Sequence, residues 1–261
     1  MKKYIMLTVL AFLTTLFYSC DEGSIKNKTN GFPQRNSNQT NTYADIQNPN
    51  NPYNYVGVYH NDALDNYIDT YNSQSTDETV FNDAYAWGIA NQYSGYDHDL
   101  YTSFTYGQYL TIVSYTFADI YNSNDVSQNF KDYLLQIETK SDTTLTVTNS
   151  IMQLTTLEDD IVTDINVSSI DQATLLATIA LAKHSIMFWE LNEPTPTSKV
   201  SGKAKADLVA FAVAEAIDST WMAFATAISG GALGPVAVAA VTARATIAAA
   251  AASAIHKEKA T

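Results

Sequence analysis

Two short segments combine histidine with aspartate, the residue types that bind metal ions and move protons. His60, Asp62 and Asp65 belong to the stretch NPYNYVGVYHNDALDNYI, and His98 lies between two aspartates in YDHD. Zinc takes three or four nitrogen, sulfur or oxygen ligands in a tetrahedral array. Because His60, Asp62 and Asp65 do not all point the same way on an ideal helix, a metal site there needs a further ligand, such as His98. The alternative is that His60 is a hydrogen-bonding residue at a helix end or interface. We predict no cofactor.

Other catalytic patterns are weak in this sequence. The acids Glu158, Asp159 and Asp160, with Asp164 following, would suit a paired-carboxylate hydrolase, but such a run on a helix surface is usually solvated. The sequence contains no GxSxG nucleophile motif and no glycine-rich phosphate loop of the Walker or Rossmann type. His184 lies in the apolar stretch LAKHSIMFW, which indicates a structural residue. The sequence therefore favours a non-enzymatic protein, with a metal-dependent or carboxylate hydrolase as an alternative.

The only cysteine, Cys20, follows an apolar run near the N-terminus. Lys2 and Lys3 precede that run, which is too short to span a bilayer comfortably, and this order is typical of a secretory signal peptide. The residues LFYSC, ending at Cys20, resemble a bacterial lipobox. In that motif the thiol receives a diacylglycerol and the preceding peptide is removed, so the resemblance implies a lipoprotein anchored to the membrane through Cys20. An ordinary signal peptide and an uncleaved signal anchor are the alternatives.

The acidic residues Asp21 and Glu22 come directly after this cysteine. They resemble the surface-export signals of lipoproteins in Bacteroidota, whereas in enteric bacteria an aspartate at this place resembles an inner-membrane retention signal. We therefore expect a lipid-anchored protein of the bacterial cell envelope. The outer membrane or cell surface is favoured, and the leaflet and side stay open.

The net charge of the chain is −13, and it is unevenly spread. Between residues 41 and 171 the only basic side chains are Lys131 and Lys140. Such a surface repels nucleic acid and anionic lipid headgroups but tolerates cations, basic peptides and neutral sugars. Most of the 17 tyrosines lie in the same half, and tyrosine binds sugars and protein interfaces well. A glycan, peptide or protein ligand is therefore predicted there, the alternative being that these tyrosines are half-buried helix residues and the acids a solvated face.

Helical periodicity dominates the chain after residue 51. Residues 21–50 are rich in Asn, Gln, Ser and Thr and predict a disordered tether. Beyond them, apolar residues recur at intervals of three and four. Two capping boxes, at Ser75 and Glu78 and at Ser169 and Gln172, indicate helix starts. The predicted helices are 56–71, 75–95, 106–121, a segment around 130–137 that includes Leu135, 145–167 with Ile165 on its apolar stripe, and 169–191.

The C-terminal part has a different composition. Residues 206–256 are almost all Ala, Val, Ile and Thr around SGGALGP, where Gly230 suits the end of one helix and Pro235 the start of the next. This pattern predicts an αα-hairpin. Asp218 and Arg244 fall at similar levels of its two arms, so an ion pair between them is possible. Because acidic residues oppose insertion into lipid, a hairpin packed on the acidic domain is favoured over a membrane-active, bacteriocin-like hairpin.

The stretch from Asn51 to Ile68 is the most distinctive part of the sequence. It resembles a segment of uncharacterised secreted or lipid-anchored proteins of Bacteroidota through Asn51-Pro52-Tyr53, Val56-Gly57, His60-Asn61 and Leu64-Asp65. The resemblance implies membership of such a family and brings no known activity with it.

Together these patterns predict a mostly α protein, a helical bundle with a C-terminal Ala/Gly-rich αα-hairpin after a disordered tether. The predicted divisions are a signal peptide (1–19), a lipid-attached tether (20–51), an acidic Tyr-rich helical domain (52–193), a linker (194–205), the hairpin (206–256) and a tail (257–261). The leading functional prediction is a binding or interaction module anchored in the cell envelope.

Overall fold

Helices make up most of the protein, as the periodicity of the sequence predicts. The structure, a computed structural model, describes residues 46–67, 76–91, 104–124, 126–192, 198–228, 245–246 and 248–252, and omits the side chains of 66–67 and 217–228. The helices are α2 (Asn54–Tyr67), α3 (Asp77–Ala90), α5 (Tyr106–Ser114), α6 (Phe117–Asn122), α7 (Gln128–Lys140), α8 (Val147–Thr163), α9 (Ser169–Asn192) and α10 (Gly202–Ile228). Residues 245–246 and 248–252 are also helical.

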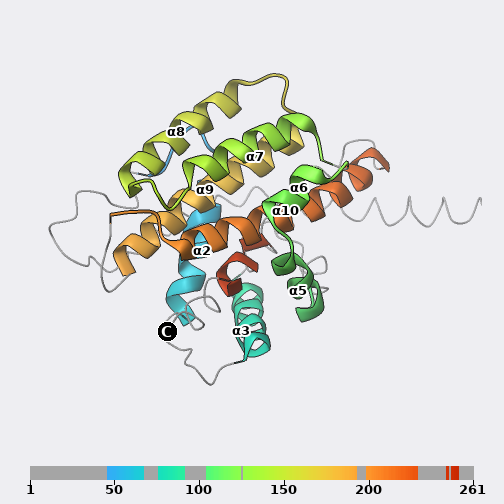
Figure 1. The fold of residues 1–261 in the computed structure, drawn as a ribbon. Coiled ribbons are helices and arrows are strands. Elements are labelled where there is room, and N and C mark those ends of the chain that lie inside the picture. Colours follow the sequence, from blue (N-terminus) through green and yellow to red (C-terminus); the bar gives the residue numbers. More distant parts are fainter. Residues whose placement is uncertain are drawn as a thin grey trace, which may run out of the picture.

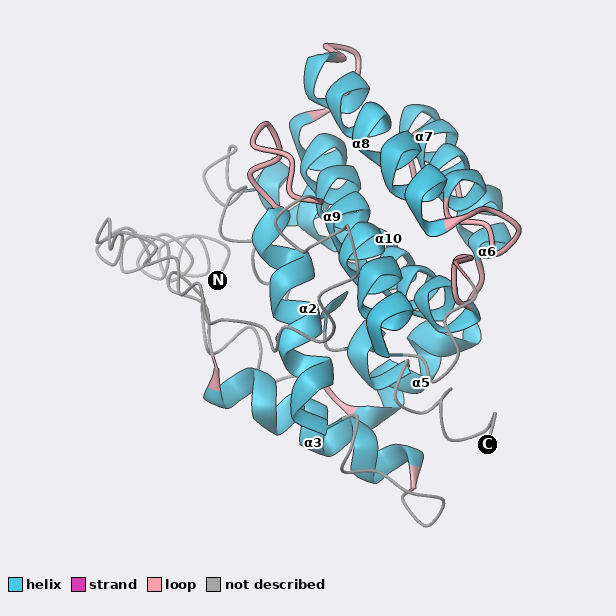
Figure 2. Cartoon of the chain, turned by 90° about the vertical axis from the view of Figure 1, so that its left-hand side faces the viewer, coloured by secondary structure: helices cyan, strands magenta, loops and turns pink. Residues whose placement is uncertain are grey.

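Helix α9 is the centre of the fold. All of its residues from Ala173 to Trp189 are buried, and α2, α7, α8 and α10 pack against it. Figures 1 and 2 show α7 and α8 at one end of the molecule and α3 and α5 at the opposite end. Because α9 is covered on all sides, its polar residues must find partners inside the protein.

The start of α9 differs from the predicted capping box. The cap is Ser168, whose hydroxyl oxygen accepts a hydrogen bond from the backbone N–H of Asp171 at 3.1 Å. Gln172 instead donates its side-chain amide to the carbonyls of Ile161 and Val162 at 2.8 and 3.2 Å. The last carbonyls of a helix have no N–H partner within that helix. Gln172 therefore supplies hydrogen bonds to two such carbonyls at the end of α8.

The predicted helix 106–121 is divided in two by a second start signal. Thr116 donates both its backbone N–H and its hydroxyl to the carboxylate of Asp119, each at 2.7 Å. This arrangement begins α6, and α5 ends at Ser114, about two turns before the predicted end at residue 121. The resulting bend leaves Tyr115 in an extended conformation between the two helices.

Two apolar residues that we assigned to buried stripes lie outside them. Leu135 is 53% exposed, because the buried face of α7 is formed by Phe130, Leu134 and Ile137. Ile165 is 95% exposed, because α8 already ends at Thr163. In both cases the periodicity identified the helix correctly, but it did not determine which apolar residues at the edge of the stripe or the end of the helix are buried.

The first arm of the predicted hairpin belongs to the same core as the acidic helices. Helix α10 begins at Gly202, and its residues Leu208 and Phe211 join the hydrophobic cluster that also contains residues of α2, α8 and α9. The turn around Gly230 lies outside the described residues, as do the signal peptide, the tether up to residue 45 and the linker residues 193–197. Over the ranges given above, none of the helices combines the length and hydropathy that crossing a membrane requires.

The folded part begins earlier than the predicted tether allows. Ile46, Asn48 and Asn51 are only 3%, 5% and 2% exposed. Residues 46–51 therefore pack into the protein, although the sequence assigned them to the tether. Their asparagines explain this difference, because they form the hydrogen bonds described next.

Candidate functional site

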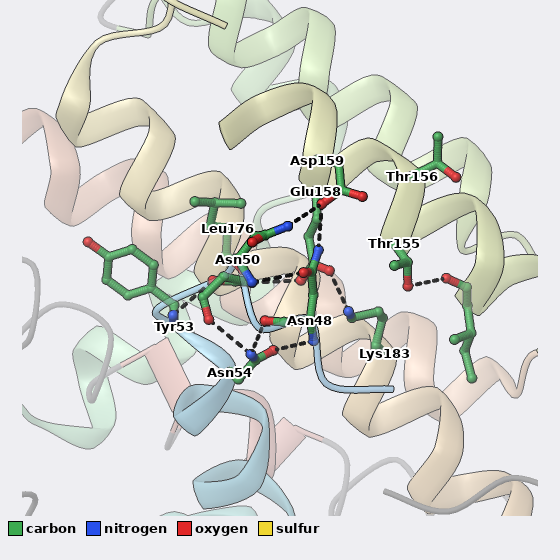
Figure 3. A network of polar contacts seen from close by, with 12 residues as sticks. Asn48, Asn50, Tyr53, Asn54, Thr155, Thr156, Glu158, Asp159, Leu176 and Lys183 are labelled. Carbon is green, nitrogen blue, oxygen red and sulfur yellow. Dashed lines mark hydrogen bonds and ion pairs between the residues drawn. The ribbon is translucent and has the colours of Figure 1, made fainter. Parts of the chain in front are cut away.

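Asparagines ahead of α2 form a buried polar network with α8 and α9 (Figure 3). Asn51 donates its side-chain amide to Glu158 at 2.6 Å and to the carbonyl of Leu176 at 2.9 Å. Asn48 donates to Asp159 at 2.9 Å. The ammonium of Lys183 lies 2.5 Å from the other oxygen of Glu158, and both side chains are fully buried.

The Glu158–Lys183 pair makes this network costly to disturb. Burial lowers the pKa of the Lys183 ammonium, and the adjacent carboxylate of Glu158 acts in the opposite direction. Removing one member of a buried ion pair leaves an uncompensated charge in the core, which costs about 3–5 kcal/mol. The network therefore has a structural role, since it fixes the position of residues 46–51 on α8 and α9.

His60 belongs to a second buried network, centred on Asp207 of α10. The Nε2 atom of His60 lies 3.6 Å from Oδ2 of Asp207. The same Oδ2 accepts hydrogen bonds from the hydroxyl of Ser185 at 2.5 Å and from the indole N–H of Trp189 at 3.0 Å. The cluster thus joins α2, α9 and α10 through one carboxylate oxygen.

This grouping of serine, histidine and aspartate is not a catalytic triad. In a triad the histidine lies between the serine and the acid, whereas here Asp207 lies between Ser185 and His60. All three residues are fully buried, so a substrate has no access to them in this conformation. The structure supports the interpretation of His60 as an interface residue.

The helices α2 and α9 approach each other closely at Gly57. A Cβ atom at this position would lie 2.4 Å from two ring atoms of His184 and 2.6 Å from the carbonyl oxygen of Ala180. Asn61, one turn further along α2, donates its amide to the carbonyl of His184 at 3.2 Å. Burial, with the nearby charges of Lys183 and His60, lowers the pKa of His184 to about 3. His184 is therefore a neutral core residue at neutral pH.

Asp62 and Asp65, two of the other candidate ligands, form no metal site with His60 among the described side chains. Asp62 is half-buried and Asp65 is exposed; burial raises the pKa of Asp62 to about 6, with a smaller contribution from Asp65. No group of three or more His, Cys, Asp and Glu side chains suited to a metal ion occurs among the side chains that the structure describes. His98 lies outside the described residues, so a site that it completes stays a prediction.

Three of the acids considered for a hydrolase, Glu158, Asp159 and Asp164, accept hydrogen bonds from other side chains, whereas Asp160 is exposed. Glu158 binds Lys183 and Asn51. Asp164 accepts a hydrogen bond from the hydroxyl of Tyr133 at 2.8 Å, and Tyr133 and the backbone N–H of Asn166 hold the pKa of Asp164 below its ordinary value. Glu158, Asp159 and Asp164 are therefore held in place by side chains from other segments of the chain.

Two further predicted features cannot be placed. The side chain of Asp218 and the whole of Arg244 lie outside the described residues, so their ion pair stays a prediction. The same holds for the lipidation of Cys20.

An open groove of about 500 Å³ lies between α5 and α10. Its apolar lining comes from Tyr109, Leu110, Val113, Tyr115, Val209 and Ala210, and Asp77, Thr116 and Lys205 contribute polar atoms. Leu110, Val113 and Tyr115 are 45%, 39% and 44% exposed. Large apolar side chains gathered at an open hollow are a common mark of a binding surface.

Sequence reasoning placed a ligand in the acidic, aromatic half but did not find this groove. Leu110 and Val113 are apolar residues of the predicted helix 106–121, and its periodicity did not show that both side chains are exposed. What the sequence did not reveal was their partner surface, because α10 follows α5 by almost a hundred residues. Comparison with protein-family models, with curated proteins and with solved structures found no match for this chain.

Proposed function

We propose that this protein is a lipid-anchored lipoprotein of the bacterial cell envelope that acts as a non-enzymatic binding module, with the α5–α10 groove as its binding surface. The groove carries the proposal, because it combines a volume of about 500 Å³ with three exposed large apolar residues, Leu110, Val113 and Tyr115. Pockets for small ligands typically have volumes of about 300–1,000 Å³. The lipobox-like sequence before Cys20 supplies the anchor, and the acidic pair after it favours the outer membrane or cell surface.

The groove uses residues other than those that stabilise the fold. The histidine, lysine and carboxylates of the two buried networks hold helices together. The groove side chains, in contrast, are exposed apolar groups whose burial by a partner would be favourable, at roughly 25 cal/mol per Å² of apolar surface covered. A partner binding at this surface gains that free energy without disturbing the buried networks.

The anchor is tested by replacing the cysteine. Cells are grown with an alkyne-labelled fatty acid, and the full-length chain is compared with its Cys20→Ser variant. We expect the wild-type protein to carry the label, to lack residues 1–19 by mass, and to stay with the membrane fraction, while the variant loses the label. A wild-type protein that retains residues 1–19 or has a free thiol would contradict the lipoprotein assignment.

The binding surface is tested by photo-crosslinking in the producing cell. A benzoylphenylalanine is placed at Leu110 in the groove or, as a matched control, at Met152, an apolar residue of α8 that is 59% exposed. We expect an adduct with one defined species from position 110 alone, and saturable binding of that species to the purified chain. Equal adducts from both positions, or none from position 110, would refute the groove as the functional surface.

A further inference from the structure

The charges around the groove are mostly negative. Asp77 contributes to the lining, and its charge helps to raise the pKa of the neighbouring Tyr109 hydroxyl, after the larger effect of burial. Thr116, also in the lining, donates two hydrogen bonds to Asp119. These hydrogen bonds lower the pKa of Asp119, so its carboxylate is ionised at neutral pH.

The one lysine in the lining is compensated. The ammonium of Lys205 lies 3.7 Å from Oδ2 of Asp142, and hydrogen bonds from Thr144 and the charge of Lys205 keep the pKa of Asp142 low. Asp77 and Lys205 are the charged side chains of the described lining. Asp119 and Asp142 adjoin it through Thr116 and Lys205, so acids outnumber ammonium groups among these described side chains. The local excess of negative charge matches that of the whole chain, whose net charge is −13.

We propose that the groove binds a peptide segment in which an aliphatic or aromatic side chain is flanked by lysine or arginine, an inference that rests on the proposed function. The apolar side chain occupies the space between Val113 of α5 and Val209 of α10. The flanking cations approach Asp77 and Asp119, since Asp142 already pairs with Lys205. Buried apolar anchors supply most of the affinity of such interfaces, whereas complementary charges at the edge raise the association rate and select the partner.

The same features argue against other occupants. A sugar needs hydrogen-bonding groups across its binding surface, but the described lining is mostly Leu, Val, Ala and Tyr. Nucleic acid and anionic lipid headgroups are repelled by the carboxylates. A second copy of this chain carries the same net charge of −13, so charge does not favour its docking.

The proposal is tested with a phage-displayed library of random peptides. The full-length chain, purified in detergent, is the target, and enriched peptides are synthesised and their affinities measured by fluorescence anisotropy. We expect enriched peptides to share Leu, Ile, Val, Phe or Tyr next to Lys or Arg. Their binding should weaken at least about tenfold when NaCl is raised from about 0.05 M to about 0.5 M, because salt screens the exposed charges.

Groove variants show where these peptides bind. Val113→Glu and, separately, Leu110→Glu place a carboxylate at exposed positions, so both should fold, and each should weaken binding at least about tenfold by spoiling the apolar contact. Met152→Glu makes the same change on α8 and should leave affinity unchanged. Asp77→Asn should weaken binding about two- to fivefold and reduce the salt dependence. Far-UV circular dichroism verifies that each variant is folded.

The outcomes separate this inference from the function on which it rests. Groove-dependent peptides without lysine or arginine would overturn the inference and leave the proposed binding module intact. Peptides that bind both glutamate variants as tightly as the wild type, or the absence of any enriched peptide, would overturn the inference and contradict the groove as the functional surface.

Discussion

Gly57 is the position at which the packing of α2 on α9 is most easily tested. Replacing a glycine by alanine inside a helix normally stabilises it by about 0.8–1.0 kcal/mol. At Gly57, however, the new Cβ would lie 2.4 Å from the His184 ring and 2.6 Å from the carbonyl oxygen of Ala180. Ordinary van der Waals contact needs about 3.4 Å or more, so α2 must withdraw from α9 by roughly 1 Å. Overpacking of this kind costs about 1–3 kcal/mol or more.

We therefore expect Gly57→Ala to lower the free energy of unfolding by about 1–3 kcal/mol. Gly107→Ala is the matched control, because a Cβ there would meet only the Thr105 hydroxyl oxygen, at 3.9 Å. This control should gain up to about 1 kcal/mol. Urea unfolding of both variants, followed by circular dichroism and by the fluorescence of the fully buried Trp189, measures the difference.

The paired design decides whether the close approach exists in solution. If Gly57→Ala proves as stable as the wild type or more stable, while Gly107→Ala gains stability as expected, α2 and α9 are further apart than described. The roles assigned to His184 and Asn61 at this contact would then be wrong as well.

Three further outcomes are expected from the buried ionisable groups. Lys183→Met leaves Glu158 uncompensated and should lower the free energy of unfolding in urea by about 3–5 kcal/mol, whereas adding Glu158→Gln should recover most of that loss. A double variant no more stable than Lys183→Met would show that the two groups do not interact. Burial raises the pKa of Asp62 from 3.8 to about 6, so the folded state binds more protons in that window. Its contribution to stability falls as the pH rises from about 4 to 6, and Asp62→Asn should remove this part of the pH dependence of the unfolding free energy. The pH dependence from His184 has the opposite sign, because burial lowers its pKa from 6.5 to about 3. As the pH falls below about 6.5, the unfolded state takes up a proton that the folded state does not, so stability is lost. His184→Gln should flatten this slope of unfolding free energy against pH.

The sequence predicted the helices better than it predicted their contacts. Periodicity and propensity are local, so they located α2, α8 and α9 within a few residues. The apolar residues of α9, Leu175, Ile179, Ile186 and Trp189, are all buried. Helix ends were less predictable where a side chain had two competing uses. Gln172 is an example, because its amide binds the carbonyls of α8 instead of completing a capping box.

The buried polar networks could not be predicted, because each joins residues that are distant in the chain. Asn51 and Leu176 are separated by 125 residues, and Ser185 and Asp207 by 22. A low-hydrophobicity stretch such as residues 46–51 is normally disordered, since it buries too little apolar surface. Here hydrogen bonds from Asn48 and Asn51 to α8 and α9 hold it in place instead.

The late position of α9 in the chain governs when the protein can fold. Helix α2 is synthesised early, yet the surface that covers its inner face begins only at Ser169. Contacts between such distant segments form slowly, because the intervening loop must close first. Helix α2 thus lacks its main packing partner until α9 has emerged, so this part of the core closes late. In the export that we propose, where the chain crosses a membrane unfolded, this delay would keep it competent for transport.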